Sequence, residues 1–337
     1  MDNSYIKLPS ILKVQRQYKN KYTDQIAEQR QTIKNIITWD DKRKLLIIGP
    51  CSLDFTDSGE KYADILSQIS KQVNDKIYMV MRAYSSKPRT SIWPKGMLYN
   101  GEYKSQWDLL NGIQTTRMLF EKISELWLPI ADEMLYPELI PYLEDYYSYT
   151  TIWSRSAENQ QHSEVASLLP YPVGIKNPMS GDMLSLCHRI KAAQSPQQAV
   201  YNKLFIQETN WNQYAHGILR WGMYEGISFS TITKDYFEKY MCFSYQQCKW
   251  AWYIVDCNHD NSGKNHTKQL PNMLQSLKIA KKLWKEDVHL LWFMVESYIY
   301  DGKQNGEKDI THGCSLTDPC IGKDKTKEFI MSLYKQL

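Results

Sequence analysis

The stretch KLLIIGPCS, residues 44–52, is an apolar run that ends in a glycine, a proline and a cysteine. A short unbroken apolar run is typical of a strand buried on both faces, as in a parallel sheet. Seven similar runs follow: KIYMVMRAY (76–84), LWLPIADEM (126–134), YTTIWSRSA (149–157), YPVGIKN (171–177), AHGILRWG (215–222), WYIVDCNHD (252–260) and HLLWFMVES (289–297). The sequence therefore predicts eight buried parallel strands.

Helix-like segments separate these runs. Residues 107–126 carry apolar side chains at close to a 3.6-residue period, and helices are also predicted over 274–283 and 325–337. Strands that alternate with helices predict an α/β protein, a single (β/α)8 TIM barrel. A doubly wound sheet is the alternative, but eight runs and the lack of a G-x-G-x-x-G fingerprint favour the barrel.

The remaining segments divide around this barrel. Residues 1–43 precede the first run and form an N-terminal extension, and residues 44–337 form the catalytic barrel. Residues 200–212 are expected to add an extra strand or hairpin before the sixth barrel strand. We expect one catalytic domain without a linker.

Composition excludes several classes of protein. The 337 residues include 41 Lys and Arg against 37 Asp and Glu, and a net charge of +4 is too balanced to predict nucleic-acid binding. No stretch approaches 18 apolar residues, so no membrane span is expected. The seven cysteines form no C-x-x-C pair, and the first ten residues lack the apolar centre of a secretory signal. We expect a reduced protein in the cytoplasm.

Residues that carry chemistry stand at the ends of all eight runs, where the functional groups of a barrel lie. In chain order they are Cys51, Arg82, Glu133, Arg155, Lys176, Arg220, His259 and Glu296. Any one alone could be a solvated strand end or part of a structural ion pair. Eight at one rim indicate a functional site, because unpaired buried charge is costly.

Part of this set suits a metal ion. Cys51, His259 and Glu296 offer a thiolate, an imidazole and a carboxylate, and Asp318 in the loop TDPCIG adds a second carboxylate. Such donors suit one divalent transition metal, Mn, Fe, Co or Zn. Cys51 alone would be interpreted as a small buried hydrophobic residue, and the spacing forms no compact motif.

The other part is cationic. Six basic residues are expected at the same mouth: Arg82, Lys87, Arg89, Arg155, Lys176 and Arg220. So many cations require anionic ligands, and phosphate and carboxylate fit best. In the sequence Lys87-Pro88-Arg89-Thr90, the proline stiffens the loop while Arg89 and Thr90 can hold a phosphate together.

Eight motifs in order then match a known family. They are IIGPCS (47–52), VMRAYSSKPRT (80–90), SRSAENQQHSEVAS (154–167), PVGIKN (172–177), ILRWG (218–222), VDCNHDNSGK (255–264), MVES (294–297) and LTDPCIG (316–322). From about Leu8 to its end, the chain resembles the class I 3-deoxy-D-arabino-heptulosonate 7-phosphate (DAHP) synthases. The resemblance implies condensation of phosphoenolpyruvate with D-erythrose 4-phosphate and water, with release of phosphate. This reaction is the first step of the shikimate pathway of aromatic amino acid biosynthesis.

The resemblance also implies roles for individual residues. It implies a metal bound by Cys51, His259, Glu296 and Asp318. It implies that Arg155 and Lys176 hold the phosphate of phosphoenolpyruvate, whereas Arg82, Lys87 and Arg220 surround its carboxylate and reacting end. Arg89 and Thr90 would bind the phosphate of erythrose 4-phosphate. From their own chemistry, Lys87 and Glu133 are candidates to orient the reacting water or move its protons.

The chain departs from the family pattern around these residues. Trp153 and Ser154 replace small residues before the phosphate-binding arginine, Trp221 and Asp132 replace glycines, and Asp260 replaces an alanine. These changes crowd and recharge the surroundings of the site, and such surroundings orient ligands. Two alternatives therefore stay open. One is a paralogue that uses another aldose phosphate in specialised metabolism, and the other is a catalytically inactive anion-binding regulatory protein.

Assembly and control are expected from the resemblance alone. It implies a homodimer or homotetramer, in which the N-terminal extension takes part in oligomer contact or regulation. Because the segment before Leu8 is short, we expect weak or absent inhibition by Phe, Tyr or Trp.

Overall fold

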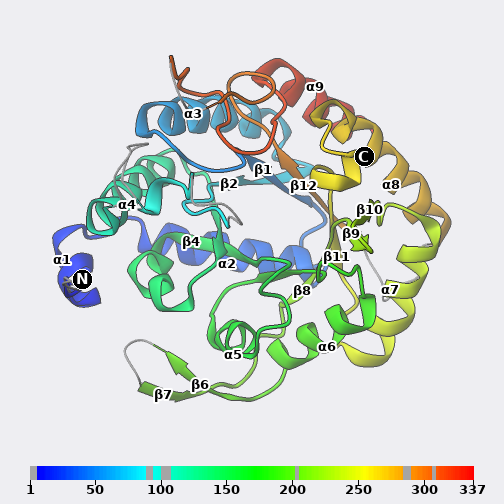
Figure 1. Ribbon diagram of the computed structural model, residues 1–337, viewed down its shortest axis with the longest axis horizontal. Coiled ribbons are helices and arrows are strands. Elements are labelled where there is room, and N and C mark those ends of the chain that lie inside the picture. The colour runs from blue at the N-terminus through cyan, green and yellow to red at the C-terminus, as the bar shows by residue number, and fades with distance from the viewer. Residues whose placement is uncertain (1–5, 89–93, 100–107, 202–204, 284–289, 306–308) are drawn as a thin grey trace.

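The computed structural model describes residues 6–88, 94–99, 108–201, 205–283, 290–305 and 309–337. Its parallel strands close into a barrel in the order β1-β12-β11-β8-β5-β4-β3-β2, and helices α3 to α9 form a ring around these strands (Figure 1). The predicted (β/α)8 barrel is therefore confirmed, and the doubly wound alternative is wrong.

Each of the eight predicted runs overlaps a barrel strand, and only β4 begins before its run. The strands are β1 (Lys44–Gly49), β2 (Ile77–Arg82), β3 (Ile130–Met134), β4 (Tyr147–Ile152), β5 (Val173–Lys176), β8 (His216–Leu219), β11 (Tyr253–Asp256) and β12 (Leu290–Glu296). Several runs extend beyond their strands into the loops that follow, and these loops contain Cys51, Arg155 and His259. The functional side chains therefore lie at or just beyond the carboxyl ends of the strands.

The ring helices follow the predicted pattern. They are α3 (Thr56–Val73), α4 (Leu109–Glu125), α5 (Gln160–Leu168), α6 (Met183–Ala193), α7 (Lys234–Gln247), α8 (Gln269–Leu283) and α9 (Lys323–Tyr334). Helix α8 begins earlier than predicted because Pro271 stands in its first turn, where a backbone N–H has no partner within the helix. Within the described ranges, no helix has the length and apolar content to cross a membrane.

In the described residues, two pairs of antiparallel strands and five short 3-10 helices accompany the barrel. Strands β6 (Gln198–Tyr201) and β7 (Phe205–Glu208) form the hairpin expected before the sixth barrel strand. A second hairpin, of β9 (Gly222–Tyr224) and β10 (Ile227–Phe229), was not predicted. The 3-10 helices are η1 (Met97–Tyr99), η2 (Pro137–Tyr142), η3 (Glu144–Tyr146), η4 (His259–Ser262) and η5 (His266–Lys268).

Part of the N-terminal extension packs into the barrel. The extension contains α1 (Ile11–Gln17) and α2 (Thr23–Ile37), and α2 passes across the barrel (Figure 1). Its side chains Ile33, Ile36 and Ile37 are buried in one cluster with the inward residues of the strands: Leu45, Ile47, Val80, Ala131, Tyr149, Ile218, Ile254 and Met294. Helix α2 is therefore a plug for one end of the barrel.

The opposite end of the barrel interior is charged. Side chains two residues apart in a strand share a face, so the positions after the apolar inward layer also point inward. These positions carry Arg82, Glu133, Lys176, Arg220, Asp256 and Glu296. The pleat of the strands thus places three positive and three negative groups below the mouth that α2 leaves free.

Candidate metal and anion site

Three of the four predicted metal ligands form one cluster. The ligand atoms of Cys51, Glu296 and Asp318 all lie within 4.8 Å of one another. Cys51 follows β1, Glu296 ends β12, and Asp318 lies in the loop before α9. Strands β1 and β12 are neighbours, with Gly49 paired to Glu296. Closure of the barrel therefore joins donors that are far apart in the sequence.

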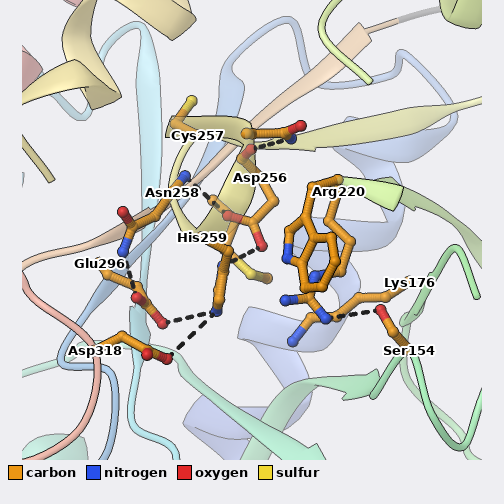
Figure 2. Close-up of polar contacts among 12 residues, drawn as sticks. Ser154, Lys176, Arg220, Asp256, Cys257, Asn258, His259, Glu296 and Asp318 are labelled. Atoms are coloured by element: carbon orange, nitrogen blue, oxygen red, sulfur yellow. Dashed lines mark hydrogen bonds and ion pairs between the residues drawn. The ribbon is translucent and has the colours of Figure 1, made fainter. Parts of the chain in front are cut away.

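His259 faces this cluster from η4. Its Nε2 lies 3.3 Å from Oε1 of Glu296 and 4.0 Å from Oδ2 of Asp318, as Figure 2 shows. Its Nδ1 lies 2.9 Å from Oδ2 of the buried Asp256. A carboxylate behind a histidine fixes the orientation of the ring and makes the exposed nitrogen a better ligand. His259 also has a φ of 54°, a left-handed backbone conformation uncommon outside glycine.

The carboxylate of Glu296 is held from several sides. Arg82 Nη2 lies 2.9 Å from Glu296 Oε1, and the Arg82 guanidinium also donates to the carbonyl oxygen of Cys51 at 2.9 Å. Asn258 Nδ2 donates to Oε2 of Glu296. Yet Glu296 Oε1 is buried and accepts no hydrogen bond from any residue in the described ranges. A buried acceptor in this state calls for a further partner.

Lys87 stands where its ammonium meets the same ligands. Its Nζ lies 2.6 Å from the sulfur of Cys51, 3.0 Å from Oδ2 of Asp318 and 3.8 Å from Oε1 of Glu296. Lys87 holds the pKa of the Asp318 carboxyl well below its usual range. Burial raises the pKa of the Cys51 thiol, and Lys87 offsets this only in part. The Lys87 ammonium therefore lies within 4 Å of one ligand atom of each of the three clustered residues.

The residues present fit a divalent metal ion. Sulfur, imidazole nitrogen and two carboxylates are donors that Mn, Fe, Co and Zn accept. Oε1 of Glu296 forms an ion pair with Arg82 but accepts no hydrogen bond from the described residues, and it lies 3.3 Å from Nε2 of His259, whose other ring nitrogen faces Asp256. The cluster of Cys51, Glu296 and Asp318 is therefore a candidate metal site, consistent with the predicted metal ion.

A cavity of about 250 Å³ opens beside these ligands, lined by Lys87, Pro88, Trp153, Arg155, Met179, Arg220, Trp221, Met223, Asn258, His259, Asp260, Lys264, Asp318 and Pro319. Two arginines in its wall lie over aromatic rings: Arg155 is 4.7 Å from the Trp153 ring centre and Arg220 is 5.0 Å from that of Trp221. Arg220 also donates to Ser154 Oγ at 3.0 Å. The cavity therefore offers fixed cations next to the candidate metal ligands.

Of the remaining predicted cations, two are buried in ion pairs and one lies outside the residues that the structure describes. Lys176 is buried and paired with Glu133, while Arg82 is buried against Glu296. Burial lowers the pKa of Lys176, although Glu133 opposes the shift. Arg89 and Thr90 lie outside the residues that the structure describes. Their predicted contacts, like the individual substrate roles of the other cations, stay predictions.

A comparison with models of protein families shows the family of this chain. The model of the DAHP synthetase I family matches residues 19–330. The chain belongs to the DAHP synthetase I family. The resemblance inferred from the eight motifs is confirmed, and with it the prediction that the chain is a 3-deoxy-7-phosphoheptulonate synthase enzyme.

Individual DAHP synthase relatives agree over nearly the whole chain. The Tyr-sensitive phospho-2-dehydro-3-deoxyheptonate aldolase of Salmonella typhimurium is 31% identical over 320 residues, which cover 93% of this chain and 88% of that protein. The Trp-sensitive enzyme of Escherichia coli is 29% identical, covering 91% and 88%. A structure of the aldolase from Francisella tularensis has a TM-score of 0.89 and 26% identity, and covers 99% of this chain and 98% of that one.

Two positioning residues of this DAHP synthase family site were not predicted. Asp256 and Asn258 flank Cys257 in the run that ends at His259, and they hold His259 and Glu296 respectively. Asp256 sits at an inward position, two residues after the buried Ile254. The period of the strand is therefore the signal that could have identified it.

Proposed function

We propose that this enzyme is a metal-dependent synthase that condenses phosphoenolpyruvate with D-erythrose 4-phosphate and water. The products are DAHP and phosphate, and the reaction is the first step of the shikimate pathway. One observation carries the proposal: the Cys51, His259, Glu296 and Asp318 donors lie beside a cavity walled by Lys87, Arg155 and Arg220. The names of the relatives, phospho-2-dehydro-3-deoxyheptonate aldolases, support the same reaction.

The charges of the site match the charges of these substrates. Phosphoenolpyruvate brings a carboxylate and a phosphate, and the aldose brings a second phosphate. Arg155 and Lys176 would hold the first phosphate, with Lys176 exchanging its contact with Glu133 for the ligand. Lys87, Arg82 and Arg220 would surround the carboxylate. Charge-assisted contacts of this kind supply both affinity and orientation.

The proposed assignment extends to the second phosphate. Arg89 and Thr90 would hold the phosphate of erythrose 4-phosphate, since in the sequence they come directly after Lys87 and Pro88, which line the cavity. This arrangement would place the aldehyde end of the sugar toward the metal ligands. The two reacting carbons would then meet between the two groups of cations.

The reaction forms two bonds before phosphate leaves. One joins carbon 3 of phosphoenolpyruvate to the aldehyde carbon, and the other joins carbon 2 to the oxygen of water. Carbon 3 of phosphoenolpyruvate attacks the aldehyde carbon, and the aldehyde oxygen takes up a proton. Water then adds to the cationic carbon 2 and loses a proton, which leaves a hydroxyl there. The bond between carbon 2 and the phosphate oxygen then breaks, the hydroxyl becomes the ketone, and its proton passes to the departing phosphate. A bound divalent ion would act as a Lewis acid on the aldehyde oxygen.

Two residues are proposed to handle protons. Lys87 is a cation beside the metal ligands, and Glu133 is a buried carboxylate whose pKa is kept low, against burial, chiefly by Lys176. Glu133 lies on β3 with Lys176 and Thr151 as its partners. We assign Lys87 and Glu133 to orient the water that attacks carbon 2 and to move its protons.

Phosphate release tests this function. Purified protein, loaded separately with Mn, Fe, Co or Zn, is mixed with phosphoenolpyruvate and erythrose 4-phosphate, and phosphate and the seven-carbon product are measured together. The proposal expects one phosphate for each product molecule. Binding of both substrates without turnover under any metal would favour the inactive anion-binding protein instead.

A second candidate is a paralogue that uses another aldose phosphate. Two indole rings, of Trp153 and Trp221, and the carboxylate of Asp260 line the cavity at positions where the family pattern has small residues. These groups change the shape and charge available to the sugar. Comparison of kcat/KM for four-carbon and five-carbon aldose phosphates separates the two candidates, because each predicts a different preferred sugar.

Assembly and compartment are proposed as well. We propose a homodimer or homotetramer, and the β6–β7 hairpin supports it because Phe205 and Ile206 are 70% and 72% exposed there. Light scattering of the protein and of a Phe205→Ser variant measures the assembly and the part of this hairpin in it. We propose the cytoplasm as the compartment, in agreement with seven cysteines that are all free thiols.

The N-terminal extension, residues 1–43, keeps its proposed role in oligomer contact or regulation. The relatives include enzymes named Tyr-sensitive and Trp-sensitive. Weak or absent inhibition of this enzyme by Phe, Tyr or Trp stays a prediction, and initial rates with each amino acid up to millimolar concentration measure it.

A further inference from the structure

Asp132 carries a buried carboxylate that no step of the proposed reaction uses. It lies on β3 between the inward residues Ala131 and Glu133, so its own side chain points out of the barrel interior. Asp132 is nevertheless only 1% exposed. A buried carboxylate of this kind persists only when its oxygens are well partnered.

Four uncharged donors serve this carboxylate. Ser85 gives two of them, its backbone N–H at 2.9 Å to Oδ1 and its hydroxyl at 2.6 Å to Oδ2. Tyr147 at the start of β4 donates its hydroxyl to Oδ2 at 3.0 Å, and the backbone N–H of Glu133 donates to Oδ1 at 2.7 Å. Asp132 thus accepts hydrogen bonds from both the main chain and the side chain of Ser85.

Ser85 begins the loop that presents Lys87. The carbonyl of Ser85 accepts from the backbone N–H of Leu98 at 2.8 Å, and the backbone N–H of Lys87 donates to the carbonyl of Lys95 at 2.8 Å. The described part of the loop is therefore clamped on one side by the 94–99 segment and on the other by Asp132. From there the Lys87 side chain reaches Cys51 and Asp318.

We propose that Asp132 is a positioning residue for Lys87. By holding both polar groups of Ser85, it fixes the loop two residues before Lys87 and so sets where the ammonium lies among Cys51, Asp318 and the cavity. The proposal rests on the proposed role of Lys87 in the reaction.

The geometry predicts which substitutions the position tolerates. Asn at 132 can accept from the Ser85 N–H through its carbonyl and can donate from its amide to the two hydroxyl oxygens, which can act as acceptors. Ala can do neither, and it leaves a buried N–H without its partner. We therefore expect Asp132→Ala to lower kcat/KM about tenfold or more and Asp132→Asn to restore most of it.

A matched control separates positioning from general destabilisation. Asp145 accepts hydrogen bonds from Arg117 at 2.6 and 2.8 Å, and this pair joins α4 to η3 in the outer layer. Asp145→Ala removes a carboxylate that is 22% exposed and pairs with the fully buried Arg117, and this contact does not touch the Lys87 loop. We expect it to lower the melting temperature while kcat/KM stays within about twofold of wild type.

A double-mutant cycle makes the decisive comparison. If Asp132 acts through Lys87, Asp132→Ala should lower kcat/KM by less than about twofold in a Lys87→Met background. If turnover of Lys87→Met is too slow to measure, the same cycle is run on the Kd of phosphoenolpyruvate. An equal loss in both backgrounds, or an Asp145→Ala loss as large as that of Asp132→Ala, would overturn the proposal.

One readout does not depend on activity at all. A crystal structure of Asp132→Ala should show Lys87 Nζ outside hydrogen-bond distance of Cys51 Sγ, against 2.6 Å here. An unchanged Lys87 in that structure overturns the positioning role. Absence of turnover by the wild-type enzyme with both substrates would instead overturn the proposed function and leave this structural comparison standing.

Discussion

The ammonium nitrogen of Lys87 lies 2.6 Å from the sulfur of Cys51, although one residue follows β2 and the other follows β1. The pair joins the two halves of the site, because Cys51 belongs to the candidate metal ligands and Lys87 lines the anion cavity. The positive charge of Lys87 therefore influences the candidate metal ligands and the anion cavity at the same time. Burial acts to lower the pKa of Lys87, but Cys51, Asp318 and Glu296 outweigh burial, and the pKa of Lys87 is raised.

Loss of the thiol should remove the metal. We expect Cys51→Ala to carry less bound metal and to lose turnover, because one of four ligands is gone. Metal content by mass spectrometry and phosphate release are measured on the same sample. Cys187→Ala, which removes a buried thiol in α6, serves as the control. Full activity of Cys51→Ala at wild-type metal content would contradict the assignment.

The two phosphate sites should separate kinetically. We expect Arg155→Ala and Lys176→Ala to raise KM chiefly for phosphoenolpyruvate, and Arg89→Ala to raise it chiefly for the aldose phosphate. A charge-assisted contact is worth about 1.5–3 kcal/mol, which corresponds to about 10- to 150-fold in binding. Lys122→Ala, at an exposed surface pair with Glu125, is the control. Equal effects of all three variants on both substrates would refute the division of the site.

Stability should depend on pH through Asp132. Burial raises its pKa to about 6, and the hydrogen bonds from Ser85 and Tyr147 offset the shift only in part. Between pH of about 4 and 6 the folded chain binds more protons at this group than the unfolded chain, so its contribution to stability is largest below pH 4 and is lost as pH rises through 6. The loss is on the order of 3 kcal/mol.

Urea unfolding of wild type and Asp132→Asn at pH 4.5, 5.5 and 7.5 measures this contribution. Asparagine does not titrate, so the stability of wild type relative to the variant should fall as pH rises over this range. Subtracting the variant removes the other groups that titrate in both proteins. A difference that does not change with pH would show that the carboxyl of Asp132 has an ordinary pKa.

The α2 plug should be needed for stability. Ile33 is fully buried among inward residues of the strands, and Ile33→Ala should lower the free energy of unfolding by about 2–5 kcal/mol, because the cavity it leaves cannot collapse fully. Leu12→Ala on α1, where the side chain is 64% exposed, should change it by less than about 0.5 kcal/mol. Similar small effects of both variants would show that the barrel does not need α2.

The fold was predictable because its signals are local. Each barrel strand is a short apolar run, and the alternation of runs and helices specifies the barrel. The β9–β10 hairpin was missed because its turn, Glu225-Gly226, lacks the Asn or Asp that marks such turns, although both residues adopt positive φ. Likewise, the position of α2 inside one end of the barrel has no signal in its own sequence, because any amphipathic helix would show the same pattern.

The sequence predicted which residue types lie in the site, but it predicted only some of the contacts between their side chains. Cys51 and Glu296 could be expected together, since strand ends meet at one rim, and Asp318 was added from its donor type and the family resemblance. The pairing of Lys176 with Glu133 and the grip of Asp132 on Ser85 depend on side-chain geometry across neighbouring strands and loops. Such contacts join residues far apart in the chain, and only the closed barrel brings them within reach.

Metal dependence of the condensation is the most direct test of the account. Protein stripped of metal with a chelator is mixed with phosphoenolpyruvate and erythrose 4-phosphate, and phosphate release is followed before and after Mn, Fe, Co or Zn is added. The account predicts no release before addition and, with at least one of these ions, release matched by the seven-carbon product. Full turnover by the metal-free protein, or no turnover with any of the four ions, would contradict it.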